Sequence, residues 1–268
     1  MDNTMEGACT FVPDVIIQAI GNEALKDHRQ ADAAEVLMRI LEIVSTGAGG
    51  SKTAVGNLVE GETRTKSRCS CSTTQVVERR PEIFNLLMLP LASGDNPSKK
   101  CPQKGQKKKG RNKGGGGVRA AKRSVADLVA EYFAEVKSDP CSECQKKGAK
   151  TNKRSSKATL TKPPTKLFIQ LMRFDWVEGL PVKIHDEVDV PLVLDLGPHM
   201  AGGEGDAMYD VDGIIYHEGA NSQSGHYAAF ARVEGREWCW LDDTKATTVG
   251  TDQALGKEAY ILSYTKRP

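Results

Sequence analysis

The sequence predicts an α+β domain, because its helical signals come first and its strand signals dominate the second half. Residues 30–44 carry apolar side chains spaced three and four apart, the period of a helix with one buried face. Residues 166–174 are the clearest strand, and the two prolines before them disfavour a helix there. Strand-like segments then continue to Tyr264, which favours an α+β arrangement.

Each predicted element has a local signal. Residues 13–20 begin with Pro-Asp and predict a helix, and the helix from Gln30 to Val44 is expected to stop at the glycines after it. Leu58-Val59 is read as a strand that turns at Gly61, and residues 83–89 form the next apolar run. Residues 124–133 predict a short helix with Ser124 as its cap and Asp127 three residues later.

Composition narrows the class of protein. A chain of 268 residues can form one large domain or two small ones. No apolar run approaches the roughly 20 residues of a membrane span, and no leader-like segment opens the chain. Seven irregularly spaced cysteines favour thiols or metal ligands in a reducing compartment over a disulfide framework. We therefore expect no membrane partner and a location in the cytoplasm, the nucleus or both.

Positive charge is concentrated in residues 98–123, which hold eleven Lys or Arg and no acid. Removing these eleven charges from the net +2 leaves the other residues at −9. The segment has few apolar side chains and a run of four glycines, so residues 95–123 are predicted to be a disordered insertion. It could bind nucleic acid or another acidic partner, or be a solvated loop with neither role.

The most informative stretch is residues 213–243, which contain a predicted β-hairpin from His226 to Asp242. His226 opens its first strand, and Asp242-Asp243 ends its second, so folding about Gly235 brings Asp242 opposite Ala228 or Ala229. Asp242 and His226 are then about 7–10 Å apart along the strand, a gap that a β-bulge or the inclination of the side chains can close. An imidazole oriented by a carboxylate is the base half of a nucleophilic triad. A surface histidine beside a solvated acid pair is the alternative.

Four cysteines suggest a metal site. Cys141 and Cys144 have the spacing of one half of a zinc ribbon, and Cys69 and Cys71 could supply the other half. Because Cys69 and Cys71 are separated by one residue only, reduced cysteines without a metal remain the alternative.

Several blocks of the chain, in order, resemble the ubiquitin-specific proteases. Pro163-Pro-Thr-Lys-Leu-Phe-Ile-Gln-Leu-Met-Arg-Phe174 is similar to the family's Leu-Pro-x-x-Leu-x-Ile-x-Leu-Lys-Arg-Phe strand. Gln30-Ala-Asp-Ala-Ala-Glu-Val-Leu37 resembles its Gln-Gln-Asp-Ala-His-Glu-Phe-Leu helix. The other matching blocks are residues 58–71, 81–89, 124–133, 141–144, 209–217, 224–227, 238–243 and 259–264. The resemblance covers roughly residues 11–266.

The resemblance implies a papain-like cysteine protease fold of thumb, palm and fingers, within one partial domain over residues 1–266. The implied regions are thumb helices at 11–47, fingers at 55–91 and 124–162, and a palm with the His/Asp box at 163–266.

The nucleophile is the main departure from the family. The family's nucleophile lies in a Gly-Asn-Thr-Cys-Tyr-Met-Asn box, which has no match in this sequence. Cys9 lacks the flanking residues of that box and the helix that would activate a thiol. We interpret Cys9 as a structural thiol and the chain as truncated at its N-terminus relative to the family.

The resemblance also implies a chemistry: thiol-dependent hydrolysis of peptide and isopeptide bonds at the C-terminal glycine of ubiquitin. His226 would be the base and Asp242 its orienting acid. Asp243 would be a weaker candidate for polarising water or assisting the oxyanion side. Asp32, His217 and Gly225 would lie near the ubiquitin tail. A structural role is favoured for His217, and a plain turn is an equally simple account of Gly225. One structural zinc would be held by Cys69, Cys71, Cys141 and Cys144, and no cofactor is needed for catalysis.

Three hypotheses follow. The chain could be most of a ubiquitin-specific protease whose nucleophile is not in this polypeptide, which would make this chain alone inactive. It could be a non-catalytic ubiquitin-binding pseudoprotease. It could also be a nucleic-acid-associated protein that works through its basic insertion. Because both His226 and Asp242 are present, the first hypothesis is favoured.

Overall fold

The computed structural model describes only part of the chain. The described residues are 18, 21, 31–47, 51–69, 76–91, 122–138, 144, 154–177, 180–203, 205–220, 224–233 and 237–268. Cys9, Cys71, Cys141 and residues 98–121 therefore lie outside them, as does the predicted helix 13–20 except for Gln18.

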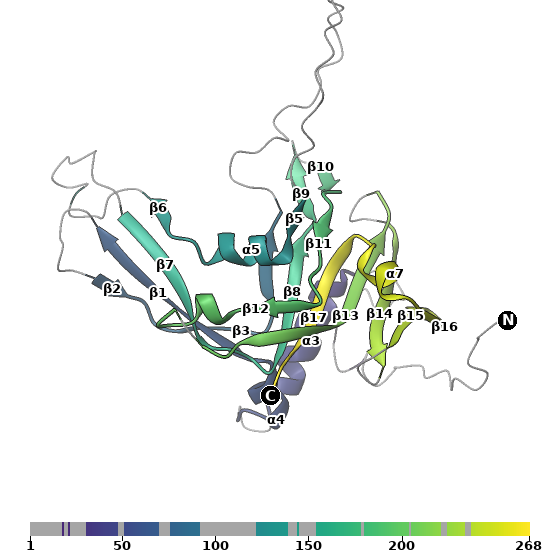
Figure 1. Ribbon diagram of the computed structural model, residues 1–268, viewed down its shortest axis with the longest axis horizontal. Helices are drawn as coiled ribbons and strands as arrows, with labels where there is room; N and C mark the ends of the chain where they lie inside the picture. Colours follow the sequence, from purple (N-terminus) through teal and green to yellow (C-terminus); the bar gives the residue numbers. More distant parts are fainter. Residues whose placement is uncertain are drawn as a thin grey trace, which may run out of the picture.

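The larger of two main sheets has eight strands and is mostly antiparallel. Its strands run in the order β16 (Lys245–Val249), β15 (Glu237–Asp242), β14 (His226–Val233), β13 (Met208–Glu218), β17 (Ala259–Lys266), β8 (Lys166–Met172) and β4 (Leu87–Pro90), with β12 (Val193–Asp195) beside β13. Only β4 runs parallel to its neighbour, β8. The sheet extends from the β14–β16 strands on one side of Figure 1 to β8 near its middle.

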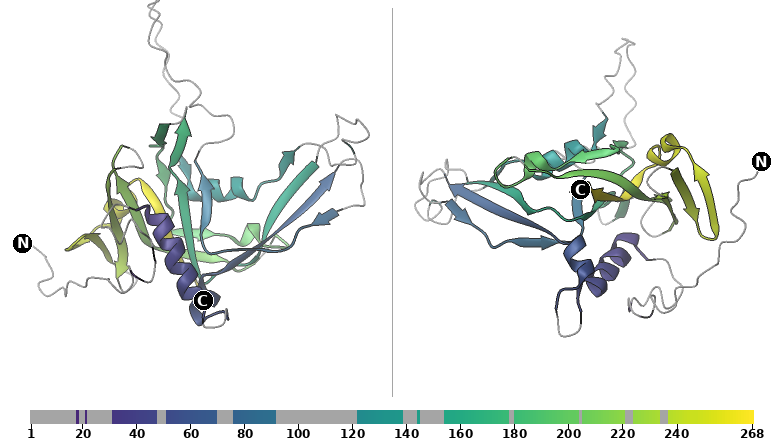
Figure 2. Two further views of the ribbon diagram at one scale, coloured as in Figure 1. Left: turned by 180° about the vertical axis from the view of Figure 1, so that it is seen from behind. Right: turned by 60° about the horizontal axis from the view of Figure 1, so that its bottom comes forward.

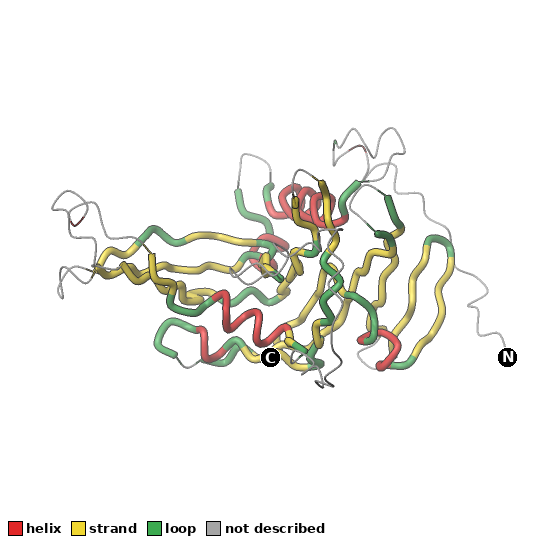
Figure 3. Tube along the Cα trace, turned by 90° about the horizontal axis from the view of Figure 1, so that it is seen from above, coloured by secondary structure: helices red, strands yellow, loops and turns green. Residues whose placement is uncertain are grey.

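The second sheet has five strands and forms an arm on the opposite side of the molecule (Figures 1 and 3). It contains β1 (Gly61–Cys69), β2 (Val76–Glu78), β3 (Glu82–Phe84), β6 (Val136–Ser138) and β7 (Arg154–Lys162). The long β1–β7 pair forms its axis. Residues 55–91, predicted to belong to the fingers, therefore contribute to both sheets, because β4 pairs with β8 of the larger one.

Two short strand pairs and a 3-10 turn lie outside the two main sheets. β9 (Phe174–Val177) pairs with β10 (Leu180–Lys183), β5 (Arg123–Ser124) pairs in parallel with β11 (Val188–Asp189), and a single 3-10 turn covers Gly197–His199. The β5–β11 pair corrects one predicted boundary, since Lys122 and Arg123 were assigned to the disordered insertion. Lys122 bonds Asp189 at 2.6 Å, and Arg123 pairs with Val188 along the strand.

Four helices lie among the described residues: α3 (Ala33–Ser45), α4 (Ala54–Val59), α5 (Val125–Tyr132) and α7 (Thr251–Leu255). The helix predicted at 30–44 begins three residues later than expected, because Asp32 caps it from an extended conformation. The predicted cap of α5 is confirmed, and Ser124 and Asp127 form a reciprocal capping box. None of the described helices combines the length and apolar character needed to cross a membrane.

The strand predicted at Leu58-Val59 is wrong: both residues lie in α4. Thr53 caps this helix, because its hydroxyl accepts from the Gly56 backbone N–H at 3.0 Å. Val59 is buried and Leu58 is exposed, as expected of a short amphipathic helix. The strand begins only at Gly61, where a side chain would overlap the ring of Phe84 on the paired strand β3.

The larger sheet is packed on both faces. On β17, the neighbouring residues Ile261 and Leu262 are both buried but belong to different apolar clusters. One cluster includes Leu128 of α5, and the other includes Ala34 of α3. The two views of Figure 2 show α3 crossing one side of the sheet. This packing fixes the strands that carry the predicted site.

Candidate active site

The predicted hairpin is confirmed, and its register explains how His226 and Asp242 meet. Ala229 pairs with Leu241, so Asp242 at the end of β15 continues the register opposite Ala228. Side chains alternate between faces along a strand, so Ala228, His226 and Asp242 share one face. A diagonal pair on one face lies about 7–8 Å apart between Cα atoms, which these two side chains can span.

His226 and Asp242 are joined by a hydrogen bond between Nε2 of the imidazole and Oδ1 of the carboxylate. This bond, assisted by the negative charges of Asp242, Asp243 and Glu218, raises the pKa of His226 above its ordinary value. Asp242 is mostly shielded, whereas His226 is half-exposed at 45%. With Nε2 held by the acid, Nδ1 is the nitrogen left to exchange a proton with a reacting group.

Asp243 lies in the turn between β15 and β16 and has a positive φ of 50°. Aspartate tolerates this left-handed conformation better than most residues. Its side chain is exposed. One imidazole nitrogen of His226 and one carboxylate oxygen each of Asp242 and Asp243 lie within 4.8 Å of one another. The structure therefore brings together the three residues predicted to be catalytic.

His217 is buried at the end of β13, on the strand next to His226. Its ring packs against Phe174 at 5.4 Å and Tyr227 at 4.8 Å between centroids. Burial, followed by the nearby charge of Lys183, lowers the pKa of His217, and Asp32 opposes this only in part. Its Nδ1 has no hydrogen-bond partner among the described residues. These surroundings favour a neutral imidazole that packs against its neighbours.

Gly225 precedes His226, and the position leaves no room for a side chain because β13 lies so close to it. A Cβ atom at this position would overlap the imidazole of His217 and lie 2.5 Å from the carbonyl oxygen of Glu218. The absence of a side chain thus lets β13 approach the start of β14 closely.

Asp32 already accepts four hydrogen bonds from its own chain. Oδ1 accepts from the backbone N–H groups of Ala34 at 2.8 Å and Glu35 at 3.2 Å. Oδ2 accepts from the hydroxyls of Tyr260 at 2.7 Å and Tyr227 at 3.4 Å. A carboxylate has about four acceptor positions, so a substrate cation would compete with these donors.

Sequence reasoning missed two residues that shape the site. Tyr260 on β17 is buried and connects Asp32 with Gln170, whose amide donates to the Tyr260 hydroxyl at 2.9 Å. Lys183, also buried, donates to backbone carbonyls of β13 and of the turn after it. Neither stands out in the sequence, although a lysine directly after Leu-Pro-Val could have been noted as a charge within an apolar strand.

No thiol joins His226, Asp242 and Asp243 within the described part of the chain. Cys239 pairs with Ala231, five residues along β14 from His226. At about 3.4 Å per residue this is roughly 17 Å, too far for proton transfer. Cys9 lies outside the described residues.

The four predicted metal ligands are only partly described. Cys69 at the end of β1 and Cys144 are both buried, and their sulfur atoms lie 3.6 Å apart. Two thiolates on one tetrahedral zinc, each at about 2.3 Å from the metal, have sulfur atoms about 3.8 Å apart. The spacing therefore fits two adjacent ligands, whereas Cys71 and Cys141 lie outside the described residues.

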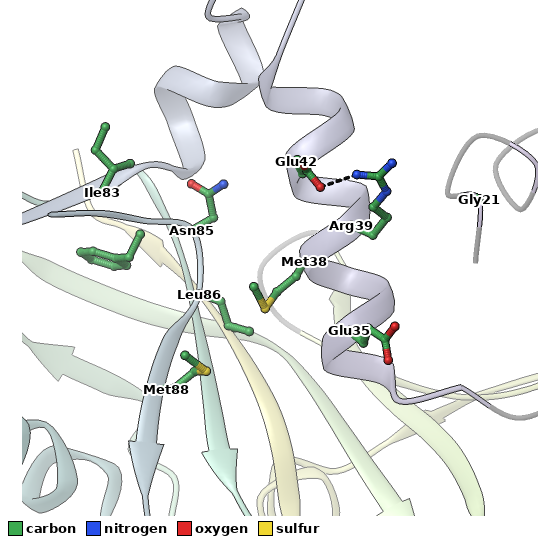
Figure 4. A pocket seen from close by; sticks show the side chains of 10 residues that line it. Gly21, Glu35, Met38, Arg39, Glu42, Ile83, Asn85, Leu86 and Met88 are labelled. Atoms are coloured by element: carbon green, nitrogen blue, oxygen red, sulfur yellow. Dashed lines mark hydrogen bonds and ion pairs between the residues drawn. The ribbon is translucent and has the colours of Figure 1, made fainter. Parts of the chain in front are cut away.

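A groove of about 820 Å³ lies between α3 and the β3–β4 segment (Figure 4). Met38, Leu86 and Met88 supply its apolar wall, and Arg39 and Glu42 bond each other at 2.5 Å on α3. None of the residues predicted to be catalytic or to bind substrate lines it.

Comparison with known proteins decides the family. Residues 3–264 match the ubiquitin carboxyl-terminal hydrolase family profile. The chain belongs to this family. Ubiquitin carboxyl-terminal hydrolase 3 of Homo sapiens is 33% identical over 174 residues, covering 62% of this chain and 32% of that protein. Ubiquitin carboxyl-terminal hydrolase 23 of Arabidopsis thaliana is 32% identical over 127 residues, covering 47% of this chain and 14% of that protein.

The chain thus spans about a third or less of the length of these hydrolases. Its fold matches the structure of the SAGA Ubp8/Sgf11/Sus1/Sgf73 DUB module bound to ubiquitin aldehyde, with a TM-score of 0.70 and 19% identity. This match covers 92% of the present chain and 51% of the other chain. The predicted α+β, papain-like fold of the ubiquitin-specific proteases is therefore confirmed. The comparisons lend no support to a nucleic-acid partner, and the predicted N-terminal truncation remains a prediction.

Proposed function

We propose that this chain recognises the C-terminal tail of ubiquitin and carries the acid–base half of a deubiquitinating cysteine protease. The observation that carries the proposal is the hydrogen bond between His226 Nε2 and Asp242 Oδ1. Membership of the hydrolase family supplies the substrate class. Asp242 holds the imidazole so that Nδ1 takes the proton of an attacking thiol and later returns it to the lysine leaving group.

The nucleophile is proposed to lie outside this polypeptide, since no described thiol is close to His226. Without it, the covalent route is lost, and such losses are on the order of 10⁴–10⁶-fold in rate. Release of a fluorophore from the C-terminus of ubiquitin by this chain is therefore expected to match buffer. Turnover that disappears in Cys9→Ala would instead identify Cys9 as the nucleophile and contradict this part of the proposal.

Ubiquitin binding tests the remaining part. Titration calorimetry with intact ubiquitin should give a measurable affinity, and ubiquitin shortened by its C-terminal glycines should bind more weakly. Equal affinities for the two forms, or no binding to either, would contradict recognition of the tail. A coding sequence upstream of Met1 that contains a Gly-Asn-x-Cys box would separate a divided protease from a pseudoprotease.

A structural zinc is the second component of the proposal, held by Cys69, Cys71, Cys141 and Cys144. The 3.6 Å distance between the sulfur atoms of Cys69 and Cys144 supports it. One zinc per chain is expected by elemental analysis, and Cys144→Ser should lower it, whereas Cys239→Ser on β15 should not. Purified protein without zinc, with all four thiols open to titration, would remove the site.

A further inference from the structure

A buried ammonium lies at the turn that leads into His226. Lys183 is the last residue of β10, and only 3% of its side chain is exposed. Its Nζ donates to the carbonyl oxygens of His217 at 2.7 Å and Gly219 at 3.2 Å. Glu258 provides the counter-charge at 3.4 Å. We propose that Lys183 is a positioning residue that holds the end of β13, and through it the start of β14, so that His226 meets Asp242.

The two carbonyls need a donor because the sheet ladder ends before them. The last pair between β13 and β17 is Tyr216 with Ala259, whereas β13 continues to Glu218. His217 and Gly219 therefore lie beyond the pairing with β17. Buried carbonyl groups are almost always hydrogen-bonded, and here the Lys183 ammonium replaces the missing strand.

Residues 217–219, which Lys183 holds, lie directly against the start of β14. Glu218, between the two carbonyls, is the register partner of His226. A Cβ atom at Gly219 would be 2.6 Å from the carbonyl oxygen of Ser224 and 2.9 Å from Cα of Gly225. The His217 ring fills the corresponding space at Gly225. Because no side chain separates the two backbones, movement of residues 217–219 displaces residues 224–226.

Lys183 is not among the charged groups that act on His226. The charged groups that face His226 are Asp242, Asp243 and Glu218, and all are acids. Removing the positive charge of Lys183 would by itself raise the pKa of His226, since less repulsion would oppose protonation. Loss of the bond to Asp242 would lower that pKa. The sign of the change therefore separates positioning from a direct charge effect.

The experiment compares Lys183→Met with Lys257→Met in the full chain by NMR titration of His226. Lys257 is a matched control, because its Nζ lies 3.0 Å from the Glu218 side chain but it is 43% exposed. Asp242→Asn gives the reference for a broken pair. We expect Lys183→Met to lower the His226 pKa by at least half of the fall in Asp242→Asn. Lys257→Met should leave it unchanged or slightly higher.

An unchanged or raised His226 pKa in Lys183→Met, with the amide spectrum of β8 and β17 preserved, would overturn the inference. If Lys183→Met does not fold, Lys183→Gln replaces it, because the amide keeps donors for the carbonyls. Lys183→Gln should then give a pKa between those of wild type and Asp242→Asn, and a value at or above wild type would overturn the inference. The inference rests on the proposed role of His226, but failure of ubiquitin binding would contradict that role without altering this comparison.

Discussion

His226 and His217 lie on neighbouring strands, and their surroundings shift their pKa values in opposite directions. The carboxylate of Asp242 stabilises the charged form of His226 and raises its pKa. Burial in an aromatic cluster disfavours the charged form of His217 and lowers its pKa. One imidazole is thus suited to accept a proton, and the other is suited to packing.

Asp242→Asn should lower the pKa of His226, because the substitution removes the charge and keeps the shape of the acceptor. Asp243→Asn should have a smaller effect, since Asp243 acts on His226 only through its charge. NMR titration of the His226 ring measures both. Equal shifts in the two variants would contradict the assignment of Asp242 as the orienting acid.

The two histidines should also give opposite contributions to the dependence of stability on pH. The raised pKa of His226 contributes stability that is fully present below about pH 6.5 and lost as pH rises through its folded pKa. The lowered pKa of His217 contributes stability that is present above about pH 6.5 and lost as pH falls through its folded pKa. Urea unfolding at pH 5.5 and pH 7.5 tests this. His217→Gln should lose less stability than wild type on acidification, and His226→Gln should lose more.

At the scale of elements, Asp32 links α3 to the larger sheet. Its carboxylate caps the helix and accepts from the hydroxyls of Tyr227 on β14 and Tyr260 on β17. The start of α3 and the strand that carries His226 therefore share one partly buried acceptor. Tyr260 also contacts the ring of Phe174 on β9 at 5.4 Å between centroids, which adds a fourth element.

Asp32→Ala should destabilise the protein by about 1–2 kcal/mol through loss of the cap, with a further cost for the two tyrosine hydroxyls left without an acceptor. Asp32→Asn should cost less, because asparagine caps helices about as well as aspartate. Chemical denaturation measures the difference. Equal losses in the two variants would show that the charge of Asp32 matters more than its cap.

Across the whole molecule, burial is uneven. Leu167, Ile169 and Leu171 of β8 are almost fully buried in the larger apolar cluster, whereas α3 buries only Ala34, Leu41 and Ser45 in its 13 residues. Met38 and Val44 of α3 are exposed, and Met38 lines the groove in Figure 4. Each large apolar side chain left exposed forgoes about 1.5–3 kcal/mol of stabilisation.

Hydrogen exchange should therefore be faster in α3 than in β8. Local opening of a weakly buried helix costs less than global unfolding, whereas central strands exchange only through the latter. Exchange measured by mass spectrometry on peptides from residues 33–45 and 166–172 checks this. Equal protection would mean that α3 is fully supported in this chain, and it would favour the pseudoprotease alternative.

Local signals determined most of the elements. The alternation in residues 166–172 and 226–233, the Ser124 cap and the apolar spacing after Asp32 each depend on neighbours in the chain, so they are readable without a fold. The exception is Leu58-Val59, where a Thr53 cap outweighed the strand-like composition. The pairing of His226 with Asp242 was also predictable, because a hairpin is a local structure whose register follows from its turn.

Only the tertiary structure decided which residues support that pair. Lys183 reaches carbonyls 34 and 36 residues away, and Tyr260 donates to Asp32 across 228 residues. The tertiary structure also places Cys69 next to Cys144 and packs His217 against Gly225. Such contacts depend on how separate elements stack, and stacking is set by the burial of whole faces, whereas a sequence pattern reports only which face each element will bury.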